Sequence, residues 1–273
     1  IYYAEKINYT QYIVRGSRMK GQYLDRFNNF PESEKMLLKA YEASQTLQIP
    51  FESFRTLVAL AGIYENQMDY NSALKYSLIA AEISDKSSFK NTLGSLYLRI
   101  AIGYSKIGDN EKAQQYYNLT LDFSITDQQA LLPEIYAHLG NFHQTVGRNE
   151  IALSYYQMCD SVMHSQNNFT EAVSAYSNMA TIYTLYNKLN TKKMYFEKCI
   201  NISEERKFRY LGRIYLNYST FLIKLDQDSL ALVYAEKALE TTIMNGDTET
   251  LPDAIRAKAD AQIKLKAFIP GIN

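Results

Sequence analysis

The stretch LRIAIGYSKIGDNEKAQQYYNLTL, residues 98–121, decides the fold of this chain. Ala101 is followed by Tyr104 three residues later and by Ala113 twelve residues later, with Gly108 between them. Apolar residues recur every three or four positions on both sides of the sequence GDNE, which is the spacing of one buried helix face. The stretch therefore predicts two helices joined by a short turn.

The same pattern returns at a nearly constant interval along the chain. Its small residue falls at Ala61, Ala101, Gly140, Ala180 and Ser219, in steps of 40, 39, 40 and 39 residues. A fixed period of this length is typical of repeat architectures. We therefore expect a single array over residues 1–273, with copies near 14–53, 54–93, 94–132, 133–172, 173–211 and 212–251 and a partial copy over 252–273.

The segments GYSKIGDNEKAQQYY and LGNFHQTVGRNEIALSYY carry a family signature. They resemble the tetratricopeptide repeat, in which Leu-Gly, Tyr and Ala recur at fixed places on a helix-turn-helix unit. The usual unit has about 34 residues, whereas this one resembles the longer-helix variants of bacterial regulators. The resemblance implies an all-α fold, a right-handed superhelical solenoid of antiparallel helix pairs.

The recurring residues explain in physical terms how the two helices of a repeat can pack together. A small residue such as Ala101 in the first helix, with Ala113 in the second, lets two helices cross at close range. The recurring tyrosines are expected to fill the space between the helices and toward the next repeat. Gly108 and Gly147 are expected at positive φ in the turn, and Asp109 near the start of the second helix can cap it.

Composition and charge exclude several classes of function. Lys plus Arg and Asp plus Glu are 29 each in a chain of 273 residues, so the chain has no net field that attracts nucleic acid. We expect no direct nucleic-acid contact from this segment. No window approaches the roughly 18 consecutive apolar residues of a membrane span, so we also expect no membrane insertion of this segment.

Residue types that carry chemistry are few. Cys159 and Cys199 occupy the same place in consecutive repeats, too far apart for a disulfide, and are expected to be reduced and buried. His138 and His143 are five residues apart and lack metal-site spacing; His143 takes the Tyr position of its repeat and is expected to pack. We predict no catalytic residue, no metal and no cofactor, and hence no enzyme.

Polar residues recur on the inner face of the predicted first helices, where ligands of this family usually lie. Amide side chains there can pair with the N–H and C=O groups of a peptide whatever its sequence. The alternative is that they are solvated surface. The expected partner-binding groove consists of Arg99, His138, Asn141, Gln144, Asn178, Thr181, Arg213 and Asn217, with Ser177 and Lys224 beside them.

The favoured function is a protein- or peptide-binding scaffold, the sensor or assembly module of a larger bacterial regulatory protein such as a membrane-tethered transcriptional or signalling regulator. One alternative is an intracellular peptide-pheromone receptor, and a less favoured one is a helical-repeat enzyme. We expect the chain to be a fragment of a longer protein. The sequence leaves two questions open, namely whether the chain forms a homo-oligomer and whether it is periplasmic or cytoplasmic in a bacterium.

Overall fold

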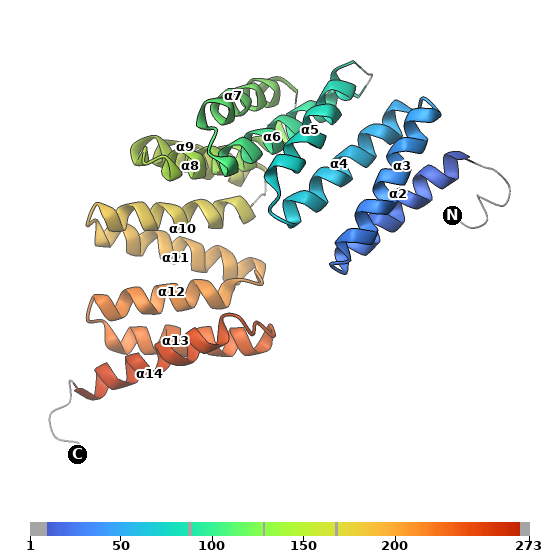
Figure 1. Cartoon of the computed structure of the whole chain (residues 1–273). Coiled ribbons are helices and arrows are strands. Elements are labelled where there is room, and N and C mark those ends of the chain that lie inside the picture. The colour runs from blue at the N-terminus through green and yellow to red at the C-terminus, as the bar shows by residue number, and fades with distance from the viewer. Residues whose placement is uncertain (1–9, 87–88, 128, 167–168, 268–273) are drawn as a thin grey trace. The chain divides into compact units, whose positions relative to one another are not determined.

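The structure is a computed structural model that describes residues 10–86, 89–127, 129–166 and 169–267. It is 87% helical, and the described residues contain no β-strand (Figure 1). The all-α expectation is therefore confirmed. Among the described residues, no helix is both long enough and apolar enough to cross a bilayer.

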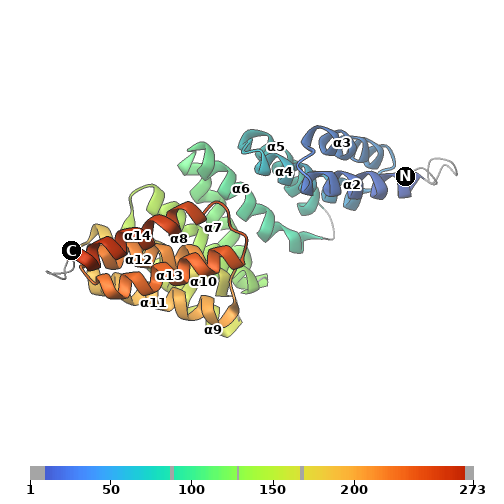
Figure 2. The ribbon, with the colours of Figure 1, turned by 90° about the horizontal axis from the view of Figure 1, so that it is seen from below.

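Helices alternate along the chain as first and second members of antiparallel pairs (Figures 1 and 2). The first helices are α2 (Thr10–Arg26), α4 (Pro50–Asn66), α6 (Leu93–Ile107), α8 (Leu132–Thr145), α10 (Phe169–Leu185), α12 (Leu211–Lys224) and α14 (Leu251–Ala267). The second helices are α3 (Phe30–Thr46), α5 (Tyr70–Asp85), α7 (Asn110–Asp127), α9 (Asn149–Gln166), α11 (Leu189–Arg206) and α13 (Asp228–Met244). Short 3-10 turns, η1 (Lys90–Thr92) and η2 (Gln129–Leu131), precede α6 and α8.

The chain divides into two compact units, Ile1–Phe142 and His143–Asn273. The boundary lies within α8, so the last residues of that helix belong to the second unit. The single continuous array stays a prediction.

Small residues twelve positions apart bring the two helices of a pair together. Ala101 on α6 and Ala113 on α7 are both completely buried, and their helices pack against each other. In another pair, the Ser219 hydroxyl donates to the carbonyl of Ala231 at 2.8 Å, a contact that only a close helix crossing permits. The predicted packing of the pair at Ala101 and Ala113 is thereby confirmed.

In four repeats, one ring from the first helix stacks on one ring from the second helix beside their crossing. The ring three residues after the small residue lies 5.4–5.6 Å from the ring fifteen residues after it, with planes within 22° of parallel. The pairs are Tyr64–Tyr76, Tyr104–Tyr116, His143–Tyr155 and Tyr183–Tyr195. The buried Tyr117 instead contacts Phe142 of α8 at 5.4 Å, so the two tyrosines of QQYY serve different interfaces.

Lys192 stands where the repeat pattern calls for a small residue, and the structure shows how it is accommodated. Its ammonium group lies 4.4 Å from the ring centroid of Phe221 and 5.6 Å from that of Phe196. Burial and the nearby Lys224 lower the pKa of Lys192. A cation over two aromatic faces thus replaces the helix contact that alanine makes elsewhere.

The turns follow the sequence expectation. Gly108 has φ 84° and Gly147 has φ 78°, a conformation that glycine adopts without a steric penalty. The carboxylate of Asp109 then accepts a hydrogen bond from the backbone N–H of Lys112 at 3.1 Å. This side-chain cap satisfies one of the free N–H groups at the start of α7.

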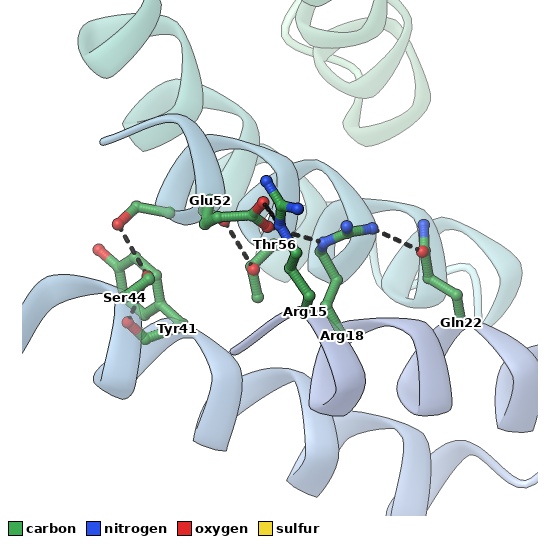
Figure 3. Close-up of polar contacts among 8 residues, drawn as sticks. Arg15, Arg18, Gln22, Tyr41, Ser44, Glu52 and Thr56 are labelled. Carbon is green, nitrogen blue, oxygen red and sulfur yellow. Dashed lines mark hydrogen bonds and ion pairs between the residues drawn. The ribbon is translucent and has the colours of Figure 1, made fainter. Parts of the chain in front are cut away.

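A buried ion pair joins α2 to α4 in the first unit (Figure 3). The Glu52 carboxylate, 1% exposed, accepts from Arg15 Nε at 2.9 Å and from the buried Arg18 Nε at 3.3 Å. Arg18 also donates to Gln22. Burial is the main cause that lowers the pKa of Arg18, followed by the charge of Arg55.

Both cysteines are free and buried, as predicted. The Cys199 thiol donates to the carbonyl of Val173 at 3.5 Å. Burial raises the pKa of each thiol from 9.0 to about 12. The thiolate, which is the reactive form, is therefore scarce in the folded protein at neutral pH.

Replacing Glu52 with Gln should destabilise the first unit strongly, because it leaves the buried Arg18 guanidinium without its counter-charge. We expect a loss of about 3–5 kcal/mol and a fall in Tm of roughly 10 °C, measured by circular dichroism. Arg15→Ala is the control, since Arg15 is half exposed and its removal should cost at most about 1 kcal/mol. Equal effects of the two variants would contradict this account.

The raised thiol pKa values predict how stability depends on pH. Folding favours the neutral form of both thiols. Their contribution to the free energy of unfolding is therefore complete below pH 9.0 and is lost as the pH rises toward about 12. A Cys159→Ala, Cys199→Ala double variant should lose less stability across that window than the parent chain. Urea titrations at pH 8 and pH 10.5 measure this difference in stability loss. Rapid labelling of either cysteine by a thiol reagent at pH 7.5, without unfolding, would refute the prediction.

Candidate functional site

The predicted groove residues lie in both units. Arg99 on α6 and His138 and Asn141 on α8 belong to the first unit. Gln144 at the end of α8, Asn178 and Thr181 on α10, and Arg213 and Asn217 on α12 belong to the second. The predicted groove residues are therefore divided between the two units.

A cleft of about 500 Å³ opens in the second unit at α10, α12 and the segment before α12. We call it the α10–α12 cleft. Three residues of the predicted groove line it, Asn178, Arg213 and Asn217, together with Ser177, which was expected beside them. The other lining residues are Thr170, Val173, Ser174, Phe208, Arg209, Tyr210 and Ile214. Amides, hydroxyls and two guanidinium groups thus surround an apolar wall, and the described lining residues include no carboxylate and no imidazole.

Two predicted amides share a hydrogen-bond chain inside the second unit. The hydroxyl of the buried Tyr156 donates to Gln144 Oε1 at 2.7 Å, and the Asn178 side chain forms a hydrogen bond with the same tyrosine. Burial raises the pKa of Tyr156, and the Asn178 bond opposes that rise. The Asn178 side chain, which also lines the cleft, is therefore tied to Tyr156, and Gln144 is not among the residues of the cleft wall.

Arg213 is held beside the cleft by the segment before α14. Its guanidinium group donates to Thr250 Oγ1 at 3.4 and 3.5 Å and forms an ion pair with Glu249 at 3.2 Å. Glu249 is 84% exposed, so this pair is a weak surface interaction that a bound carboxylate can replace.

Thr181 and Asn217 are both exposed but differ in their relation to the cleft. The Thr181 hydroxyl donates to the carbonyl of Ser177 at 3.1 Å, and Thr181 lies outside the cleft lining. Asn217 on α12 and Asn178 on α10 both line the cleft. The structure thus brings Asn178, Arg213 and Asn217 together and leaves Thr181 outside.

The sequence did not predict seven of the cleft residues, among them Phe208, Arg209 and Tyr210. These three lie between α11 and α12, whereas the predicted groove was confined to helix faces. Tyr210 is 66% exposed and adds aromatic surface to the cleft lining. The run KFRY, two aromatic residues around an arginine in a turn, was the available signal.

The first unit carries a different, charged surface around Arg99. Its guanidinium group donates to Glu65 at 2.9 Å between α6 and α4, and burial raises the pKa of Glu65 while Arg99 lowers it. Two depressions of about 400 and 460 Å³ share Glu65, Asn66 and Arg99 as lining residues. Their remaining charged residues are Asp25, Arg26, Lys106 and Glu134.

His138 and His143 belong to no group of three or more potential metal ligands among the described residues. His138 is half-buried, and burial together with Lys106 lowers its pKa, so the ring is neutral near pH 7. His143 is buried and stacks on Tyr155, which confirms its predicted packing role. Asn141 is half-buried on α8, and the side chain of His164 lies outside the described residues. No group of three or more potential metal ligands occurs in the part of the chain that the structure describes.

Solved structures share this fold at low sequence identity. Aspartyl phosphate phosphatase F of Bacillus subtilis matches with a TM-score of 0.71 and 13% identity, over 97% of this chain and 73% of that protein. The quorum sensor NprR of B. thuringiensis matches with a TM-score of 0.61 and 16% identity, over 91% and 68%. No family model and no curated protein matches the sequence.

A third match names the repeat type. A signal transduction ATPase with numerous domains from Pyrococcus horikoshii, which has a tetratricopeptide repeat sensor, matches with a TM-score of 0.67 and 14% identity. The match covers 96% of this chain and 39% of that protein. The chain thus has the helical-repeat fold of tetratricopeptide type, as its sequence resemblance implied.

Replacing Tyr156 with Phe should remove the hydroxyl that joins Gln144 and Asn178. The expected cost is about 1 kcal/mol of unfolding free energy, measured by urea titration. Tyr117→Phe is the matched control, because Tyr117 is equally buried and its hydroxyl has no hydrogen bond among the described residues. A Tyr156→Phe variant as stable as its control would show that the hydrogen-bond chain is not a stabilising feature.

Proposed function

We propose that this chain is a non-enzymatic peptide- or protein-binding scaffold whose α10–α12 cleft holds an extended segment of its partner. The observation that supports this most is the composition of the cleft. Asn178 and Asn217 supply amides from two successive first helices, Arg213 supplies a cation, and Phe208 and Tyr210 supply aromatic surface. A few polar groups placed on an apolar wall are typical of ligand sites.

Each part of the cleft has a distinct task in this proposal. The two amides pair with backbone N–H and C=O groups of the ligand, which requires no particular ligand sequence. Arg213 exchanges its exposed partner Glu249 for a carboxylate of the ligand, in a charge-assisted hydrogen bond. Tyr210 covers an apolar ligand side chain. Specificity then depends on the spacing between that side chain and the carboxylate.

We further propose that the chain serves as the sensor or assembly module of a larger bacterial regulatory protein, such as a membrane-tethered transcriptional or signalling regulator. The sensor role in the Pyrococcus protein supports this at the level of the fold. The second candidate is an intracellular peptide-pheromone receptor, which the fold shared with a quorum sensor favours. Flanking sequence separates them: a membrane span and a DNA-binding domain after residue 273 support the first, and a DNA-binding domain before residue 1 supports the second.

The experiment that tests the cleft uses a peptide mixture with free carboxyl ends. The immobilised full chain captures peptides from the mixture, mass spectrometry identifies them, and fluorescence anisotropy of the tightest one gives its Kd. The Asn178→Ala, Asn217→Ala double variant should bind it roughly tenfold more weakly, because each lost amide costs about 0.5–1.5 kcal/mol. Arg213→Ala should weaken the binding of peptides with a free carboxyl end more than the binding of their amidated forms.

The control is a double variant of two exposed asparagines on α11, Asn190→Ala and Asn201→Ala, which should bind as the parent chain does. Because Asn178 also contacts Tyr156, equal Tm values must be confirmed, and Asn217→Ala alone gives the cleaner comparison. Unchanged affinity in the cleft variants, with loss in the α11 variant, would reject the cleft as the binding site.

A further inference from the structure

The turn between α10 and α11 differs from the equivalent turns of the other helix pairs. Leu185, at the end of α10, is 68% exposed, and Tyr186 and Leu189 are 39% and 36% exposed. Leu185 stands five residues after the small residue of its helix. At this position five other first helices have Arg26, Asn66, Lys106, Thr145 and Lys224. An apolar side chain is thus exposed at a position that is otherwise polar.

The start of α11 also departs from the repeat. In two pairs the residue before the second helix is Asp69 or Asp109, whose carboxylate accepts a hydrogen bond from a backbone N–H of the first turn at 3.1 Å. Lys188 takes this place before α11 and makes no side-chain cap. The first turn of α11 has no acidic residue, whereas α3, α7, α9 and α13 each have one. Lys192 and Lys193 follow, so positive charge gathers where the helix dipole disfavours it.

A fourth lysine lies near this group. Burial and then the charge of Lys224, an exposed residue at the end of α12, lower the pKa of Lys192. Lys193 donates to Gln227 at 3.5 Å, so the α10–α11 and α12–α13 turns are neighbours at one edge of the second unit (Figure 1). Among the described residues these lysines form no ion pair with a carboxylate. The nearby Asp226 is paired with Lys264 at 3.1 Å.

We call the three apolar residues and the four lysines the α10–α11 turn patch. Its members are Leu185, Tyr186, Leu189, Lys188, Lys192, Lys193 and Lys224. The patch is internal to the second unit, because α9 packs against α10 and α12 packs against α11. The neighbouring turns on both sides consist of described residues. Its exposure therefore does not arise at an end of the chain.

Three local rules of helix formation are broken at this one turn. An apolar side chain is exposed at a polar position, a lysine replaces a capping residue, and cations gather at a helix N-terminus. Each departure lowers the stability of the folded chain. Departures of this kind collect at functional sites, because binding rather than folding selects the residues there.

We propose that the α10–α11 turn patch docks on an anionic lipid bilayer. Leu185, Tyr186 and Leu189 enter the headgroup layer, which favours apolar and amphipathic side chains. The lysines around them lie close to the anionic lipid headgroups. Docking of this kind needs no membrane-spanning helix. The patch shares no residue with the α10–α12 cleft, so it is a second site beside the proposed peptide site.

An acidic protein surface is the alternative occupant, and it fits less well. A standard protein interface has about 20–30 residues on each side, whereas the apolar part of this patch is three side chains. Leu185, Tyr186 and Leu189 line none of the three clefts described above, and side chains that dominate protein binding usually fill such hollows. A lipid surface needs no hollow, because a few inserted side chains and several cations act together there.

The test is flotation of the full chain with phosphatidylcholine vesicles, with or without about 30% of the anionic lipid phosphatidylglycerol. We expect binding to the anionic vesicles alone, and weaker binding at about 300 mM than at about 20 mM salt. Leu185→Asn, which introduces the residue that α4 has at this position, should weaken binding roughly tenfold, because one leucine side chain is lost from the lipid contact.

Lys188→Asp gives a result that damage to the fold cannot imitate. It should weaken vesicle binding at least about fivefold, because each cation near an anionic surface contributes roughly fivefold in affinity. It should also raise Tm by roughly 2 °C, because the aspartate caps α11 as Asp109 caps α7. Loss of binding together with a gain in stability identifies the lysine as part of the docking surface.

Fluorescence shows whether the turn itself enters the lipid. The chain has no tryptophan, so Leu185→Trp introduces a single fluorophore. Its emission should shift to shorter wavelength when anionic vesicles are added, because the ring leaves water. Ile107→Trp, at the partly exposed end of α6 in the first unit, is the matched control and should show no shift.

The remaining outcomes separate this site from other causes. The Asn178→Ala, Asn217→Ala variant should bind vesicles as the parent chain does, whether or not the cleft binds peptides. Absence of binding to anionic vesicles at low salt overturns the proposal, as does unchanged binding of both Leu185→Asn and Lys188→Asp. Binding to soluble polyglutamate that these two variants abolish, without vesicle binding, also overturns it and assigns an acidic protein as the occupant.

Discussion

The close approach of two helices at residues twelve apart is the constraint on which this structure depends. Ala101 against Ala113, and Ser219 against Ala231, leave too little room for larger side chains at the crossing. The stacked ring pairs then fill the wider space beyond it and fix the rotation of each helix. Once crossing and rotation are set, every other residue of the repeat has a fixed direction.

The direction in which each side chain of the repeat points decides whether it packs against another helix or faces solvent. Tyr104 and Tyr116 face each other within a pair, and Tyr117 faces the next pair. Residues on the side of a first helix that faces neither its partner helix nor the neighbouring pair are not needed for packing, so they can differ between repeats. In the second unit they hold the amides of the α10–α12 cleft, and in the first unit they hold the Arg99–Glu65 ion pair. One scaffold thus offers two chemically different surfaces.

Electrostatics supports the fold where apolar packing is incomplete. Lys192 replaces a small residue and is accommodated by the ring of Phe221 at 4.4 Å. Glu52 is buried between α2 and α4 because two arginines compensate its charge. The same helix α2 turns Lys20 and Arg26 outward to solvent.

The sequence by itself determined the repeat, the helix pairs, the glycine turns at Gly108 and Gly147 and the buried free cysteines, because each of these follows from local periodicity and residue size. It also predicted Asn178, Arg213 and Asn217 as groove residues from their helical phase, and these three line one cleft. It did not predict Phe208 and Tyr210 in the cleft wall, because a turn has no periodicity from which side-chain direction can be read. It did not show that Tyr156 forms a hydrogen bond with Asn178 or that Thr181 lies outside the cleft. Only the tertiary structure decided these points, because they depend on distances between side chains on different helices.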